Sequence, residues 1–242
     1  MFKSLRIALG FLTRLPVNPR DFEANDLGDS LRFFPVVGVV YGILTWSLLQ
    51  LLSNFLAVEI AAWLTVFSGA FLNGCIHWDG WADTADGLGG AEAEKRLAIM
   101  KDSRLGAFGG IALAFLAIGK VFTLEGLAGC SLANFVAVST LSRWGMALLI
   151  FTQPSVSKGL LQAFQPQNRS RNLGIATLIM LALLSFAWPV GFLLLAITLV
   201  TLLLMAVFVR KRFGGITGDI LGAGNELVEL VCWLSLNIII KF

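Results

Sequence analysis

The sequence is short of charged residues. Only 14% of its 242 residues are Asp, Glu, Lys or Arg, whereas 57% are hydrophobic and the mean hydropathy is +0.83. A soluble domain of this size cannot bury so much apolar surface, so the composition excludes a soluble globular fold and indicates a polytopic membrane protein. Strand patterns are also absent outside the apolar runs, where a lipid-buried backbone has to be helical.

Cysteine and histidine are scarce as well. The three cysteines are scattered and odd in number, which argues against both a disulfide framework and a cysteine metal site. His77 is the only histidine, so a zinc site is disfavoured. The first 16 residues carry three basic side chains and lack a small-x-small site, so no cleavable signal peptide is expected.

Long apolar runs are what the sequence has in abundance. Runs of about 17 to 25 apolar residues can cross a bilayer, and about seven of them predict an all-α bundle of about seven transmembrane helices. They lie at Phe34–Leu52, Ile60–Ile76, Ala107–Leu124, Leu132–Phe151, Leu173–Ala187, Val190–Val209 and Leu221–Ile240. One integral-membrane domain is expected over residues 1–242, with residues 1–32 as a cytoplasmic or interfacial segment.

The basic residues are distributed unevenly along the chain. Of the 18 Lys and Arg residues, five lie in residues 1–32, four in 77–106, three in 152–172 and three in 209–220. If seven spans alternate sides, these segments share one side, and the connections 53–59, 125–131 and 188–189 on the other side hold no Lys or Arg. The positive-inside rule then predicts that the basic side is cytoplasmic.

The stretch GCIHWDGWADTADGLGG, residues 74–90, gathers polar groups in this apolar chain. Asp79, Asp83 and Asp86 are spaced i, i+4, i+7, which places them on one stripe of a helix. Carboxylates so close together repel unless a cation lies among them, and oxygen-only ligands suit Mg²⁺ bound with substrate phosphates. His77 precedes the stripe and is a general base, a partner of a carboxylate or an interfacial polar group.

Two further segments add candidates. In MKDSRLGAFGG, residues 100–110, Asp102 and Arg104 stand before an apolar run. In RKRFGGITGDILGAGNELVE, residues 210–229, the basic and glycine positions suit a diphosphate, and two acidic residues follow one heptad apart. The candidates in this second segment are Arg210, Lys211, Arg212, Gly214, Gly215, Asp219 and Glu226. Arg143 lies inside an apolar run, where it needs a carboxylate or a phosphate as partner.

These motifs resemble those of the cobalamin synthase family, adenosylcobinamide-GDP ribazoletransferase. The resemblance is carried by HWDGWADTADGLGG (77–90), IMKDSRLGAFG (99–109) and GGITGDILGAGNE (214–226), with TRLP (13–16) and FFPVVGVVYG (33–42) nearer the amino terminus. It implies a multi-pass enzyme of the bacterial inner membrane. That enzyme would join adenosylcobinamide-GDP to α-ribazole, or to its 5′-phosphate, release GMP and require Mg²⁺.

The resemblance and the residues together suggest roles. We expect Asp79, Asp83, Asp86 and Glu226 as metal ligands, and one of His77, Asp102 and Asp219 as the acceptor of the nucleophile's proton. The expected phosphate-binding positions are Arg104, Arg143, Arg210, Lys211, Arg212, Gly214 and Gly215. The expected partners are the two substrates and the lipid bilayer, without nucleic acid, and a homo-oligomer is left open.

Three other functions compete. Asp83-x-x-Asp86-Gly87 matches the start of the CDP-alcohol phosphotransferase signature, but the Ala-Arg that should follow and the second aspartate pair are missing. A prenyltransferase with aspartate-rich diphosphate motifs is a weaker match. A cation-coupled transporter would also use an acidic cluster, but it predicts polar residues spread through several spans instead of gathered at one side.

Overall fold

The computed structural model describes all residues except 1, 18–22, 158–160, 162–163, 165–168 and 242. The described residues form helices, and the only β pairing among them is an isolated bridge between Ser155 and Ile216. The helices are α1 (Phe2–Leu12), α2 (Ala24–Ser30), η1 (Leu31–Phe33), α3 (Phe34–Ser53), α4 (Val58–Leu72), α5 (Ile76–Gly87), α6 (Ala93–Ile99), α7 (Ala107–Gly126), α8 (Leu132–Thr152), α10 (Arg169–Leu184), η2 (Ser185–Ala187), α11 (Val190–Phe213) and α12 (Gly218–Ile239). The all-α fold expected from the sequence is confirmed.

Five helical segments within the described residues are long and apolar enough to cross a membrane. They are Asp26–Ser53, Ala107–Gly126, Leu132–Thr152, Arg169–Ala187 and Val190–Phe213. A sixth is formed if the bent pair α4 and α5 counts as one span. This is roughly consistent with the expected seven, and the chain is a multi-pass membrane protein by this criterion.

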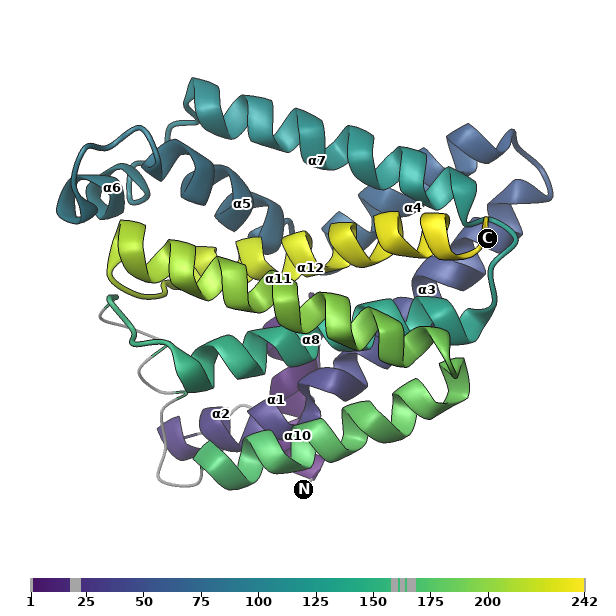
Figure 1. The fold of residues 1–242 in the computed structure, drawn as a ribbon, viewed down its shortest axis with the longest axis horizontal. Helices are drawn as coiled ribbons and strands as arrows, with labels where there is room; N and C mark the ends of the chain where they lie inside the picture. The colour runs from purple at the N-terminus through teal and green to yellow at the C-terminus, as the bar shows by residue number, and fades with distance from the viewer. Residues whose placement is uncertain (1, 18–22, 158–160, 162–163, 165–168, 242) are drawn as a thin grey trace.

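Two expected spans differ from the structure. The run Ile60–Ile76 is broken after Leu72, where α5 turns by 90° from α4. The run Leu221–Ile240 does form a helix, α12, but polar side chains such as Asn225, Glu226 and Glu229 keep it below the apolarity of a lipid-facing span. Instead α12 lies inside the bundle, where it packs against α5, α7, α8 and α11 (Figure 1).

Helices α3 and α8 share the most extensive contact among the described helices. Gly38 and Gly42 of α3 lie against the α8 backbone, because a Cβ at Gly38 would come within 2.5 Å of Thr140 Cα and one at Gly42 within 2.5 Å of Val136 Cα. Small residues four apart allow such close approach between membrane helices. The FFPVVGVVYG motif is therefore explained by helix packing.

The connections gather at the two ends of the bundle. Figure 1 shows α6 and the α11–α12 turn at one end, and the α3–α4, α7–α8 and α10–α11 connections at the other. The basic segments 77–106 and 209–220 thus share one end. This grouping agrees with the alternation of sides that the sequence predicts.

Candidate active site

A tight turn sets the direction of α5. Gly74 and Cys75 have positive φ angles of 65° and 61°, and their N–H groups donate to Phe71 and Ala70 at 2.9 and 2.8 Å, which ends α4. The left-handed conformation is easy for glycine and costly for Cys75. The turn brings α5 against the first turns of α12 at the basic end of the bundle.

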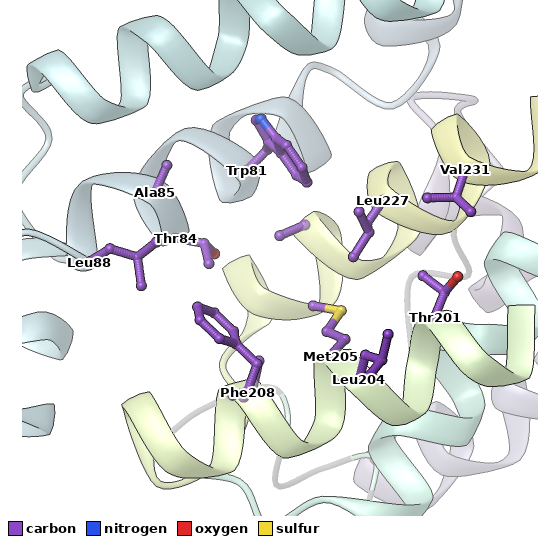
Figure 2. A pocket seen from close by; sticks show the side chains of 12 residues that line it. Trp81, Thr84, Ala85, Leu88, Thr201, Leu204, Met205, Phe208, Leu227 and Val231 are labelled. Atoms are coloured by element: carbon purple, nitrogen blue, oxygen red, sulfur yellow. The ribbon is translucent and has the colours of Figure 1, made fainter. Parts of the chain in front are cut away.

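Helix α5 presents two different faces. Trp81, Thr84 and Leu88 point toward α11 and α12 and line an apolar cavity of about 490 Å³ with Met205 and Phe208 (Figure 2). No charged residue lines this cavity. The aspartates lie on the other faces of α5, so the helix separates an apolar surface from an acidic one.

The acidic face borders a cleft of about 560 Å³ between α5, the segment 100–105 and α7. We call it the acidic cleft. Its charged lining residues are Asp79, Asp83, Lys101, Asp102 and Arg104. Two carboxylates of the stripe therefore share a cleft with the 100–104 segment, and Lys101 is an addition that the sequence analysis did not select. Its position next to Asp102 was the available signal.

Asp219 of α12 lies near the aspartates of α5 without lining the acidic cleft. A Cβ at Gly80 would come within 2.5 Å of the Asp219 carbonyl oxygen, so the backbones of α5 and α12 touch between Asp79 and Asp83. The charges of Asp79, Asp86 and Asp219 all act on Asp83. No described side chain forms an ion pair with Asp79, Asp83 or Asp219. Asp79, Asp83 and Asp219 thus lie near one another without an ion-pair partner among the described residues.

Asp102 and Arg104 form an exposed ion pair. The Arg104 guanidinium donates to Asp102 with Nη2 at 2.6 Å and with Nε at 3.0 Å, and its side chain is 87% exposed. The hydrogen bonds from Arg104 lower the pKa of Asp102 to about 2. Paired in this way, Asp102 has little affinity for a proton near neutral pH.

Asp86 caps helix α7. Its two carboxylate oxygens accept the N–H groups of Gly106 and Gly109, each at 2.8 Å. A Cβ at either glycine would come within 2.4 Å of the carboxylate, so this contact requires glycine at both positions. A carboxylate at a helix amino terminus accepts hydrogen bonds from free N–H groups, and its negative charge interacts favourably with the positive end of the helix dipole. The role of Asp86 as a metal ligand stays a prediction.

The residues of the acidic cleft suit Mg²⁺ only when a substrate supplies further ligands. Among the residues that the structure describes, no three His, Cys, Asp or Glu side chains converge into a ready metal site. Magnesium, however, usually takes only one or two protein carboxylates and completes its shell with water and phosphate oxygens. Asp79, which is exposed, and Asp83, which is half-buried, supply such a donor set. These residues therefore suit a magnesium ion that is bound together with the phosphate groups of a substrate.

A second group of charges lies in the bundle interior. Lys120 of α7 pairs with Glu226 and, at 3.0 Å, with Glu229 of α12. Arg143 of α8 donates to Glu229 at 3.2 Å, and its guanidinium lies 3.9 Å from the centre of the Tyr41 ring. These four charged residues are each at most 5% exposed. We call Lys120, Arg143, Glu226 and Glu229 the core network.

The core network contains two residues that were expected at the active site. Glu226 shares a helix face with Asp219, but seven residues along a helix is about 10 Å, and at that depth Glu226 meets Lys120 instead of the aspartates. Arg143 has found a carboxylate partner, Glu229, and does not line the acidic cleft. Lys120 and Glu229 were not selected, although charges inside apolar runs were the signal for them.

His77 faces the core network and not the acidic cleft. Its Nδ1 lies 3.1 Å from the Asn225 amide nitrogen, 3.3 Å from that of Asn73 and 3.6 Å from a Glu226 oxygen. The side chain is only 3% exposed. Because α5 turns His77 away from Asp79 and Asp83, its position differs from that of a base acting within the cleft.

The basic triplet and the glycines after it end α11. Arg210, Lys211 and Arg212 are exposed in its last turn. Gly214 takes the left-handed cap conformation with φ of 80°, and a Cβ at Gly215 would lie 2.2 Å from the Pro154 carbonyl oxygen. Turn geometry and packing account for both glycines. Phosphate binding by this segment stays a prediction.

Comparison with known proteins gives the family. The model of the family described as cobalamin-5-phosphate synthase matches residues 4–237. An adenosylcobinamide-GDP ribazoletransferase of Desulforamulus reducens is 36% identical over 237 residues, covering 95% of this chain and 94% of the relative. Proteins of the same name from Shewanella sp. and Vibrio cholerae are each 34% identical, covering 96% and 95% of this chain and 93% and 91% of the relatives. No solved structure matches. The chain therefore belongs to the cobalamin-5-phosphate synthase family.

Proposed function

We propose that this protein is an adenosylcobinamide-GDP ribazoletransferase. It joins adenosylcobinamide-GDP and α-ribazole, or α-ribazole 5′-phosphate, and releases GMP with adenosylcobalamin or its 5′-phosphate. Family membership over residues 4–237 supports the reaction. The observation that carries the chemistry is the acidic cleft, where unpaired carboxylates lie beside Lys101 and Arg104 as a diphosphate requires.

The residues of the cleft suggest how the reaction proceeds. Asp79 and Asp83 would hold Mg²⁺, which supplies positive charge to the diphosphate oxygens when it is bound. Lys101 and Arg104 orient the diphosphate and neutralise the charge that develops on its bridging oxygen. The ribazole hydroxyl forms a bond to the phosphorus attached to cobinamide, and the bond from that phosphorus to the bridging oxygen breaks, so GMP leaves.

The proton of the attacking hydroxyl needs an acceptor. Among the three candidates, Asp102 is held by Arg104 and His77 faces the core. Asp219 is half-buried, carries no ion pair among the described residues and lies against α5 between Asp79 and Asp83. We assign the proton transfer to Asp219.

The orientation in the membrane follows from charge. The basic segments 77–106 and 209–220 lie at the same end of the bundle as the acidic cleft (Figure 1). By the positive-inside rule we place this end in the cytosol and the protein in the bacterial inner membrane. The two substrates then enter from the cytosolic side.

The function is tested with purified protein in liposomes. GMP and the corrinoid product are quantified by chromatography after incubation with adenosylcobinamide-GDP, α-ribazole and Mg²⁺, and each component is omitted in turn. GMP release that needs all three supports the proposal. CMP release from a CDP-alcohol, or ion flux without GMP release, would replace it with one of the competing functions.

A further inference from the structure

A third cavity borders the first turn of α12. It measures about 280 Å³ and is bordered by α1, α5, α8, α12 and the connection after α8. One part of its wall is apolar, with Phe11, Met146 and Phe164. The other part is polar, with His77, Ser157 and Asp219. The rings of Phe11 and Phe164 lie 4.9 Å apart at the apolar part.

His77 has an unused nitrogen in this region. Its Nδ1 is close to Asn73 and Asn225, but its Nε2 is buried and has no hydrogen-bond partner among the described residues. In either tautomer of the ring, Nε2 therefore lacks a hydrogen-bond partner among the described residues. A buried polar atom without a partner costs about 1 to 3 kcal/mol. His77, which carries this atom, also lines the cavity, so a ligand group that bonds to Nε2 would remove that cost.

The cavity and the acidic cleft share a wall. Asp219 lines the cavity, and its backbone touches Gly80 between Asp79 and Asp83 of the cleft. A ligand group that reaches Asp219 from the cavity therefore arrives beside the aspartates. Two neighbouring compartments with a carboxylate at their boundary are the arrangement expected where two substrates have to meet.

We propose that this cavity binds the nucleoside that supplies the attacking hydroxyl group, and we call it the nucleoside cavity. Its flat base packs against the Phe11 and Phe164 rings, and its sugar hydroxyls bond to His77 Nε2 and Asp219. A cavity of about 280 Å³ suits a nucleoside and is too small for a corrinoid. This inference rests on the proposed function, which requires a nucleoside as second substrate.

A matched pair of tryptophan substitutions tests the assignment. Ser157 lines the nucleoside cavity and Ser103 lines the acidic cleft, so each can be enlarged to block one compartment. We expect Ser157→Trp to raise the KM for α-ribazole at least about 10-fold, with the KM for adenosylcobinamide-GDP unchanged. Ser103→Trp should raise the KM for adenosylcobinamide-GDP and leave the KM for α-ribazole unchanged. Steady-state GMP release at varied concentrations of each substrate measures both constants.

Substitution of His77 tests the polar contact. His77→Asn keeps an acceptor near the Nδ1 position and removes Nε2, whereas His77→Gln keeps a polar atom near the Nε2 position. We expect His77→Asn to raise the KM for α-ribazole about 10-fold, as for a lost buried hydrogen bond. His77→Gln should restore much of the affinity. Calorimetric titration of α-ribazole into each purified variant checks binding directly, even where turnover is poor.

The outcomes separate the two proposals. If the wild type releases GMP but Ser157→Trp and His77→Asn leave the KM and the binding of α-ribazole unchanged, the nucleoside cavity is wrong and the function stands. If Ser157→Trp raises the KM for adenosylcobinamide-GDP instead, the compartments have been assigned in the wrong order. If the wild type releases no GMP with both substrates and Mg²⁺, the function is wrong, and the cavity assignment falls with it.

Discussion

Two packed helices, α5 and α12, carry carboxylates whose surroundings differ in charge. In the acidic cleft, Asp79 and Asp83 of α5 have no cationic partner among the described residues. In the core network, Glu226 and Glu229 of α12 are matched by Lys120 and Arg143. A carboxylate whose charge is already balanced holds helices together, whereas one left unbalanced at a cleft is free to bind a cation or a substrate.

The largest effect is expected in the cleft. Asp83→Asn removes a charge that Mg²⁺ would need, so we expect GMP release to fall at least about 10⁴-fold. Stability should not fall, because the substitution relieves repulsion among Asp79, Asp83, Asp86 and Asp219. Asp79→Asn should act similarly. GMP release and the Tm of the protein in detergent are measured together.

Thr84→Ala is the matched control for Asp83→Asn. Thr84 lies next to Asp83 but on the face of α5 that borders the apolar cavity (Figure 2). We expect its turnover to stay within about twofold of the wild type. Near-normal turnover of both aspartate variants would show that Asp79 and Asp83 are not the metal ligands.

The core network should show the opposite pattern. Glu229→Gln leaves Arg143 and Lys120 with one carboxylate between them in a buried setting, which should cost about 3 to 5 kcal/mol of unfolding free energy. The loss is measured as a lower Tm and a lower yield of folded protein. Glu59→Gln, at an exposed position of α4, is the control and should change the Tm little.

A double substitution sharpens this result. Arg143→Met combined with Glu229→Gln removes one charge of each sign and restores the balance, so the pair should be less destabilising than the sum of the single changes. Additive losses would mean that Arg143 and Glu229 do not act on each other. If Glu229→Gln instead lost activity at an unchanged Tm, the core network would have a role in catalysis and not only in stability.

Asp86 stands between the two groups and should show an intermediate effect. Asp86→Ala removes both acceptors at the start of α7, and we expect it to cost about 1 to 2 kcal/mol of unfolding free energy. Asp86→Asn keeps one oxygen acceptor and should cost less. If Asp86→Asn instead loses as much turnover as Asp83→Asn at unchanged stability, Asp86 acts as a metal ligand.

The sequence predicted the helices and the stripe because both depend on local pattern. Apolar runs identify helices by length, and the i, i+4, i+7 spacing of Asp79, Asp83 and Asp86 needs only helical geometry. It could not predict that Asp86 would meet Gly106 and Gly109, because that contact depends on where α7 starts in space.

The sequence also does not show at which depth in the bundle each residue of a helix lies. Asp219 and Glu226 share a face, but the sequence does not say how far the cleft extends along α12. The ion-pair partner of Glu226, Lys120, comes from α7 and lies 106 residues away in the chain. The break of the expected span Ile60–Ile76 also depends on tertiary packing, since the positive φ of Cys75 is sustained only by its surroundings.

The smallest effect is expected at the exposed ion pair of the cleft. Because the Arg104 hydrogen bonds lower the pKa of Asp102 from its ordinary 3.8 to about 2, Asp102 stays ionised above about pH 4. The stabilisation from this pair is present above the ordinary pKa and is lost only as the pH falls toward 2. Any acid limb of the pH–rate profile between about pH 5 and 8 must therefore come from another group.

Asp102→Asn accordingly should lower turnover only about 3- to 10-fold, by releasing Arg104 from its position, and should leave the acid limb where it is. Asp219→Asn, in contrast, should remove the acid limb together with most of the turnover. The two profiles are recorded from GMP release at saturating substrate. An acid limb that vanishes in Asp102→Asn and persists in Asp219→Asn would assign the proton transfer to Asp102 instead of Asp219.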